Sequence, residues 1–324
     1  MKKENPSGWR TAKKERAAYG TYFLGQNIIY TFPFMFLTTY LLMSGISPVK
    51  TAGILVLLKV WDAVNDALFG GLIDGIRFKK GKFLPWLRIS LPVILLATLA
   101  LFHIPDSFSE NGKLIWFAVA YLIWDTSYTL CDVPIFGMIT TMTDVQEERT
   151  SLMTTGRIFA NIGVIIAMIC GYVLPTEMVG MSFSAVAIII VIIALINMVF
   201  ICVTGKEHSL KAAQTEESFS LRRMFSYLVR NKYLLVYYLG MFLYSGLNTA
   251  AAVLQFACFY LFNSAMIATL VGALSFAPAV LISFIMPKLL KRFDKYKMFM
   301  VGAVSYAVVH PWTSHDILLA KPRL

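Results

Sequence analysis

The stretch that decides the fold reads Leu57-Leu-Lys-Val-Trp-Asp-Ala-Val-Asn-Asp-Ala-Leu-Phe69, with two carboxylates inside an apolar run. Together with its flanks, from residue 51 to residue 76, it is long enough for a membrane-spanning helix, which needs about 20 residues. A charged side chain at the centre of a bilayer costs about 2.5–3.5 kcal/mol on insertion scales, so charges there usually serve a function. Two acids in one such helix therefore predict a polar site within the membrane.

The polar residues of this stretch share one helical face. Asp62 and Asp66 are four residues apart, which places their Cβ atoms about 5–6 Å from each other, and Asn65 lies between them. Carboxylate and amide oxygens that converge inside a membrane are the ligands that a desolvated Na⁺, Li⁺ or H⁺ needs. We therefore expect a site for a monovalent cation. The alternative is a structural ion pair with Lys59, one turn earlier.

The composition is that of a membrane protein. The chain is 58% apolar and 15% charged, with a mean hydropathy of +0.68, whereas soluble domains are about 45–50% apolar. We therefore expect an all-α polytopic protein embedded in a lipid bilayer. The apolar runs that are long enough to cross a membrane lie near residues 18–43, 51–76, 84–104, 114–143, 152–174, 182–203, 234–262 and 266–290.

The basic residues predict the topology. Lysines and arginines gather before the first run and after the second, sixth and eighth runs, whereas the opposite loops carry only Lys50 and Lys113. Because positive residues stay on the cytoplasmic side, the N-terminus is predicted to be cytoplasmic in a multi-pass protein of the cell membrane. The net charge of +11 arises at these borders and forms no groove-sized face, so nucleic acid is not an expected partner.

Signals for other chemistry are missing from the sequence. The phosphate-binding pattern GxxxxGK[ST] is absent, as are zinc-ligand spacings and catalytic triads. The four cysteines all fall in apolar runs without CxxC spacing and are predicted to be buried thiols. We therefore expect neither an enzyme nor a bound cofactor.

A polar break divides the chain. Residues 1–204 are predicted to form a six-helix bundle, residues 205–232 a cytoplasmic linker with a short interfacial helix near 221–228, and residues 233–324 an incomplete second bundle. Tight basic loops follow the second run of each half, at 77–82 and 291–297. This repetition is typical of the two six-helix repeats of the major facilitator superfamily.

Several motifs narrow the resemblance. Residues 71–80, Gly-Leu-Ile-Asp-Gly-Ile-Arg-Phe-Lys-Lys, resemble the signature of that superfamily, which implies that Asp74 and Arg77 latch the cytoplasmic side. Over most of residues 17–300 the chain resembles the glycoside–pentoside–hexuronide:cation symporters. This resemblance implies a location in a bacterial inner membrane. The strings that carry this resemblance are Trp61-Asp-Ala-Val-Asn-Asp66, Gly81-Lys-Phe-Leu-Pro-Trp86, Tyr128-Thr-Leu-Cys-Asp-Val-Pro134, Glu148-Arg149 with Arg157, and Asn231-Lys-Tyr-Leu-Leu235.

The resemblance implies roles for single residues. The family's cation site matches Asp62, Asn65, Asp66 and Thr129, which would bind Na⁺ if coupling is to sodium. A gating role is implied for Arg149.

The implied sugar site departs from the family in part. Its charged contacts match Asp132 and Arg157, and Phe136 stands where the melibiose permease has tryptophan. Gln26 and Asn27 stand where that permease has a lysine and an aspartate. Loss of this first-helix carboxylate argues against a galactoside and leaves another sugar, a pentoside or a uronide open.

The residues themselves also favour a sugar site. Asp132 and Arg157 lie in neighbouring apolar runs, where pairing would offset the cost of burying each charge. A carboxylate and a guanidinium suit sugar hydroxyls, which both donate and accept hydrogen bonds. The alternative is a purely structural salt bridge. Tyr128 is a candidate for stacking on the sugar ring, and Asp125 receives no role.

The end of the chain does not fit a continuing bundle. The ninth run, residues 298–309, is too short to cross, and residues 310–324 contain prolines, histidines and an aspartate. We expect a truncated or frame-shifted product in which the second half cannot close over the sugar. Such a chain should not catalyse coupled accumulation.

Three functions remain open from the sequence. The first is a symporter that couples a glycoside, pentoside or hexuronide to Na⁺, H⁺ or Li⁺ by alternating access. The second is a non-transporting relic or regulatory membrane protein descended from one. The third is a symporter for another amphiphile, such as a lysolipid.

Overall fold

The computed structural model describes residues 9–208, apart from 77, 79, 80 and 176–178, together with 226, 229–240 and isolated residues between 285 and 304. The chain divides into two compact units, Met1–Ser245 and Gly246–Leu324, and the fold described here belongs to the first. Several predictions lie wholly or largely outside the described residues: the runs 234–262 and 266–290, most of the linker, the incomplete second bundle, the tail and Cys258.

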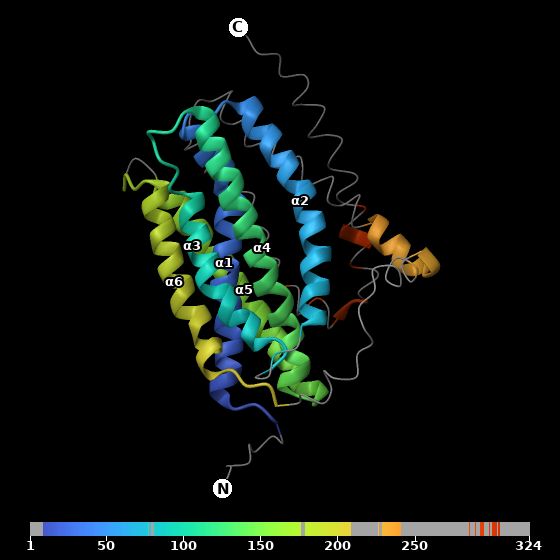
Figure 1. The fold of residues 1–324 in the computed structure, drawn as a ribbon. Coiled ribbons are helices and arrows are strands. Elements are labelled where there is room, and N and C mark those ends of the chain that lie inside the picture. Colours follow the sequence, from blue (N-terminus) through green and yellow to red (C-terminus); the bar gives the residue numbers. More distant parts are fainter. Residues whose placement is uncertain are drawn as a thin grey trace. The chain divides into compact units, whose positions relative to one another are not determined.

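Residues 9–208 form a bundle of six long helices (Figure 1). The helices coincide with the first six predicted apolar runs to within a few residues, so the all-α fold is confirmed. Their bounds are α1 (Lys13–Met43), α2 (Pro48–Gly75), α3 (Leu84–Leu101), α4 (Glu110–Met142), α5 (Gln146–Val173) and α6 (Phe183–Thr204).

Local sequence accounts for where the helices begin. Proline stands in the first turn of α2 and α3, where its missing N–H costs no helical hydrogen bond. The side chain of Ser109 accepts a hydrogen bond from the backbone N–H of Gly112 at the start of α4, and Ser182 does the same for Ala185 at the start of α6. Gly45, with φ of +81°, turns the chain between α1 and α2.

Four of these helices, α3 to α6, are long and apolar enough to cross a membrane by length and composition. The other two are no shorter, at 31 residues in α1 and 28 in α2. Within its apolar run α2 carries Lys59, Asp62 and Asp66. The structure thus confirms a polytopic helical membrane protein, in which α2 carries three charged side chains in the middle of its length.

The packing places α1 and α4 at the centre of the contacts. α1 packs on α5 and α6, α3 packs on α4 and α6, and α2 packs chiefly on α4 (Figure 1). Because α2 touches little else, α4 is the element that faces its polar residues. α4 and α5 scarcely touch each other.

Small residues let α1 and α5 approach closely. A Cβ built on Gly163 would lie 2.4 Å from the backbone oxygen of Leu24, and one on Gly171 would lie 2.1 Å from Phe36. Such stripes of small residues are the usual way in which membrane helices pack. The stripe on α5 consists of Gly156, Ala160, Gly163, Ala167 and Gly171, all buried.

Gly163→Ala is expected to destabilise the bundle. The added methyl group meets backbone rather than a flexible side chain, and overpacking of this kind typically costs about 1–3 kcal/mol. Thermal unfolding of the detergent-solubilised protein measures the effect. The matched control is Gly53→Ala on α2, where a Cβ meets nothing within 4 Å. Equal unfolding temperatures for the two variants would contradict the packing described here.

Two buried or half-buried glutamates tie together the end of the bundle that holds the start of α1 and the end of α6. Glu148 is buried and accepts hydrogen bonds from the backbone N–H groups of Arg10 and Thr11, both at 3.0 Å, and from the Thr143 hydroxyl. Glu207 accepts from three successive backbone N–H groups, those of residues 82, 83 and 84, at 2.8–2.9 Å. A carboxylate at a helix N-terminus is favourable, so Glu207 fixes the start of α3.

An exposed ion pair lies at the same end. The guanidinium of Arg10 donates to Asp144 at 3.1 Å and holds the pKa of that carboxyl below its ordinary value. The N-terminal segment, the α4–α5 connection and the segment after α6 therefore meet on one side, the side predicted to be cytoplasmic.

Candidate functional site

A polar cluster joins α2 to α4. The hydroxyl of Thr129 donates to Oδ1 of Asp66 at 3.0 Å and accepts from Nδ2 of Asn65 at 2.8 Å. Asp125 lies one helical turn before Thr129 on α4, and Tyr121 lies two turns before it; both face α2. The Tyr121 hydroxyl donates to Asp62 at 3.3 Å, and Asp125 accepts from Asn65. The four residues predicted from the sequence as cation ligands thus lie together across one helix interface.

The oxygen of the Asn65 amide is the most informative atom of this cluster. Asn65 is fully buried, and its Oδ1 has no hydrogen-bond partner within the described part of the chain. A buried acceptor without a partner is costly unless something else supplies the missing interaction. An oxygen that binds a cation has no hydrogen-bond partner when the cation is absent, which is the condition of Asn65 Oδ1 here. The residues of the cluster therefore fit the predicted cation.

The structural ion pair considered as an alternative also forms. Nζ of Lys59 lies 2.5 Å from Oδ2 of Asp62, and the lysine side chain is 66% exposed. Among the described residues, Asp66 has no such partner. The pair therefore accounts for one of the two carboxylates and leaves the other for a different role.

The donor set is one of hard oxygen ligands. Among the described residues, no group of three or more His, Cys, Asp or Glu side chains is arranged to hold a metal ion. Two carboxylates with a neutral amide and a hydroxyl, instead, offer oxygens alone, which suits a hard cation better than a transition metal.

Sequence reasoning missed Asp125 as a member of this cluster. Its carboxyl oxygen Oδ2 accepts from Nδ2 of Asn65 at 3.0 Å, and it also faces the carboxyls of Asp62 and Asp66. The signal was available, because Asp125 is four residues before Thr129 and so occupies the same face of α4.

A second polar group lies one turn further along α4. Nε2 of Gln26 on α1 donates to Oδ1 of Asp132 at 2.7 Å, and the amide oxygen of Gln26 is buried without a partner in the described residues. Tyr128, one turn before Asp132, interacts with the same carboxyl. Asn27 donates to the backbone oxygen of Phe23 on its own helix at 2.9 Å.

The predicted pairing of Asp132 with Arg157 is wrong for this structure. Asp132 takes Gln26 as its partner, and Arg157 is exposed on α5 without an ion pair among the described residues. The reason is the packing, since α5 lies on α1 and scarcely touches α4. The alternative of a purely structural salt bridge between Asp132 and Arg157 is wrong for the same reason.

Aromatic rings gather around Tyr128, the residue that interacts with Asp132. The ring of Tyr30 lies 4.9 Å from that of Tyr128 and stacks on Phe34 at 5.6 Å, and Trp124 stacks on Tyr128 at 5.7 Å. Phe34 is 63% exposed. Elsewhere on α4, Phe136 is 46% exposed and meets Phe23 edge-on.

The predicted gating residues are described only in part. Arg149 donates to the backbone oxygens of Thr143 and Thr140, at 2.9 and 3.4 Å, and so braces the end of α4. The side chain of Asp74 and the whole of Arg77 lie outside the described residues.

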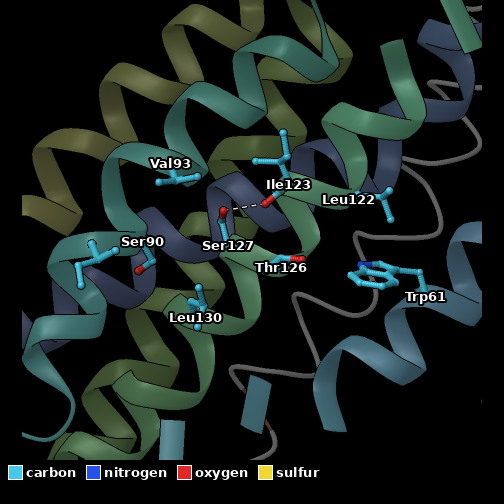
Figure 2. A pocket seen from close by; sticks show the side chains of 9 residues that line it. Trp61, Ser90, Val93, Leu122, Ile123, Thr126, Ser127 and Leu130 are labelled. Carbon is cyan, nitrogen blue, oxygen red and sulfur yellow. Dashed lines mark hydrogen bonds between the residues drawn. The ribbon is translucent and has the colours of Figure 1, made fainter. Parts of the chain in front are cut away.

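A shallow pocket lies apart from both polar groups. Figure 2 shows Trp61 of α2 and residues of α3 and α4 around it, with Ser127 donating to the backbone oxygen of Ile123. Its walls are mostly apolar, and its α4 residues lie on a different face of that helix from Asp125, Thr129 and Asp132. It does not belong to the candidate site.

Comparison with known proteins identifies the class. Residues 18–311 match the family described as MFS/sugar transport protein, and the chain belongs to this family. The resemblance stated from the motifs is thereby confirmed at the level of the family, whose members are transporters and not enzymes.

Individual relatives are distant and longer. The chain is 26% identical over 299 residues to an uncharacterized symporter of Bacillus subtilis strain 168, covering 90% of this chain and 65% of the relative. It is 24% identical to the isoprimeverose transporter of Lactiplantibacillus pentosus, covering 83% of this chain and 58% of that protein. A glucuronide carrier protein homolog of Escherichia coli K12 is also 24% identical, with 91% and 65% covered. The chain thus spans less than two-thirds of the length of these relatives.

Proposed function

We propose that the protein is a cation-coupled sugar symporter of the cell membrane that works by alternating access, with its N-terminus in the cytoplasm. The observation that carries the proposal is the position of both polar groups on α4. Thr129 belongs to the cluster with Asn65 and Asp66, and Asp132, three residues later, belongs to the group with Gln26. Sites for a cation and for a sugar therefore share one helical face.

This arrangement supports coupling in physical terms. A cation that draws Asp66 and Asn65 together also moves Thr129, because Thr129 is hydrogen-bonded to both residues. A shift of α4 at Thr129 displaces Asp132 as well, because Asp132 lies less than one helical turn away. Coupling between two ligands is reciprocal, so a sugar bound at Asp132 strengthens cation binding by the same factor. Movement of the loaded protein between its two orientations then carries both ligands in one direction.

The chemistry of the site favours certain sugars. Asn27 offers neutral hydrogen bonds where a second carboxylate would clasp a galactoside, and Arg157 is an exposed cation on the neighbouring helix. A guanidinium suits a carboxylate. Among the relatives are an isoprimeverose transporter and a glucuronide carrier homolog. We therefore propose pentosides or hexuronides as the substrate class, and Na⁺, Li⁺ or H⁺ as the coupling ion.

Uptake into proteoliposomes tests the function. The intact protein, meaning a form that carries both six-helix halves, is reconstituted and given an inward Na⁺ or H⁺ gradient, and it is expected to accumulate a labelled pentoside or glucuronide against its gradient. Collapse of the ion gradient with an ionophore should stop accumulation. Gradient-independent uptake, or inhibition by lysolipids but not by sugars, would contradict the proposal.

A further inference from the structure

Asp125 lies in the middle of α4, and the family resemblance gives it no role. It is half-buried, and its carboxyl oxygen Oδ2 and backbone oxygen accept from Nδ2 of Asn65 at 3.0 and 3.3 Å. The charged groups of the facing helix that act on its carboxyl are Asp62 and Asp66, together with Lys59. A third carboxylate in a membrane site is expensive, and its retention needs a reason.

The hydrogen bonds of Asn65 supply that reason. The amide nitrogen has two hydrogens, and one is directed at Asp125 and the other at Thr129. The Thr129 hydroxyl has a single hydrogen, which is directed at Oδ1 of Asp66 at 3.0 Å and at the backbone oxygen of Asp125 at 3.3 Å, so the hydroxyl accepts from Asn65 rather than donating to it. With both hydrogens held on the α4 side, the amide oxygen is left buried and without a protein partner among the described residues.

We propose that Asp125 is a positioning residue for cation binding: it holds the Asn65 amide so that its oxygen remains available as a cation ligand. The proposal rests on the proposed function and deepens it, because it names the group that orients the ligand. Without the Asp125 carboxyl, the amide is free to turn its nitrogen toward the cation, which a positive ion disfavours.

Cation dependence of uptake by the intact protein tests this role. Asp125→Ala is expected to raise the Na⁺ or H⁺ concentration for half-maximal stimulation by about tenfold or more, as expected for loss of a hydrogen bond to a charged group. Asp125→Asn keeps a carbonyl oxygen as acceptor and is expected to recover most of this loss. Sugar affinity measured without the coupling ion should stay unchanged in both variants, which also shows that they are folded.

Thr126→Ala is the matched control, because the next residue on α4 lines the separate apolar pocket. An unchanged cation requirement in Asp125→Ala overturns the proposal. Equal losses in Asp125→Ala and Asp125→Asn also overturn it, since they would assign the effect to charge rather than to orientation. A wild-type protein without any cation stimulation would overturn the proposed function itself, and the inference with it.

Discussion

Asp66→Ala is expected to abolish cation-driven sugar accumulation while leaving sugar binding largely intact. Asp66 is the carboxylate of α2 that no lysine neutralises among the described residues, and the Thr129 hydroxyl orients it. Asp66 is exposed in the structure, so the value for a hydrogen bond to a charged group applies, about 1.5–3 kcal/mol, which corresponds to about 10- to 150-fold in cation affinity. Asp62→Ala should act in the same direction, because the two carboxylates share the site.

Ion-gradient-driven uptake and equilibrium sugar binding together measure this effect. Asp106→Ala is the control, since this acid is exposed in the loop between α3 and α4. Normal Na⁺- or H⁺-driven accumulation in Asp66→Ala would return the carboxylate to a structural role. A parallel loss of sugar binding would instead indicate that the protein is misfolded or that the two sites are one.

Asp132→Ala is expected to weaken sugar binding by a similar factor. The carboxylate is oriented by Gln26 from α1, and its removal leaves the Gln26 amide and the sugar hydroxyls without their acceptor. A loss of about 2–5 kcal/mol is typical when one side of a buried polar contact is removed. Equilibrium binding of a nitrophenyl-glycoside or a labelled glucuronide to the intact protein is the measurement.

Arg157→Ala tests whether Arg157 supports Asp132 or instead contacts the carboxylate of a uronide substrate. Because Arg157 forms no ion pair with Asp132, its removal should leave Asp132 undisturbed and weaken only substrates that carry a carboxylate. A uronide should therefore lose affinity more than the matching neutral glycoside. Unchanged binding of every sugar in both Asp132→Ala and Arg157→Ala would remove these residues from the substrate site.

The candidate site was predictable where its residues share a helix. Asp62, Asn65 and Asp66 form one face by helical spacing alone, and their cost in a membrane marks them as functional. Thr129 and Asp132 were assigned by resemblance, and the structure places them opposite α2 and α1. The pairing of Asp132 with Arg157 was wrong, because adjacency along the chain does not determine which helices touch. The four-residue spacing from Thr129 placed Asp125 on the same helical face, but only the structure shows its hydrogen-bond partner Asn65, which lies 60 residues away in the sequence.

The sequence by itself determined that six long helices lie in residues 9–208, and it placed their ends to within about six residues. Apolar runs longer than the bilayer is thick must be helical, because only a helix satisfies every backbone group within one segment. Only the tertiary structure decided which helices meet. Gly163 lets α5 lie against α1, so Arg157 stands on a helix that scarcely touches α4. α2 packs chiefly on α4 and faces it with Asn65 and Asp66. Such choices depend on the shapes of surfaces distant in the chain, since lipid is as apolar as the helices and packing alone selects among partners.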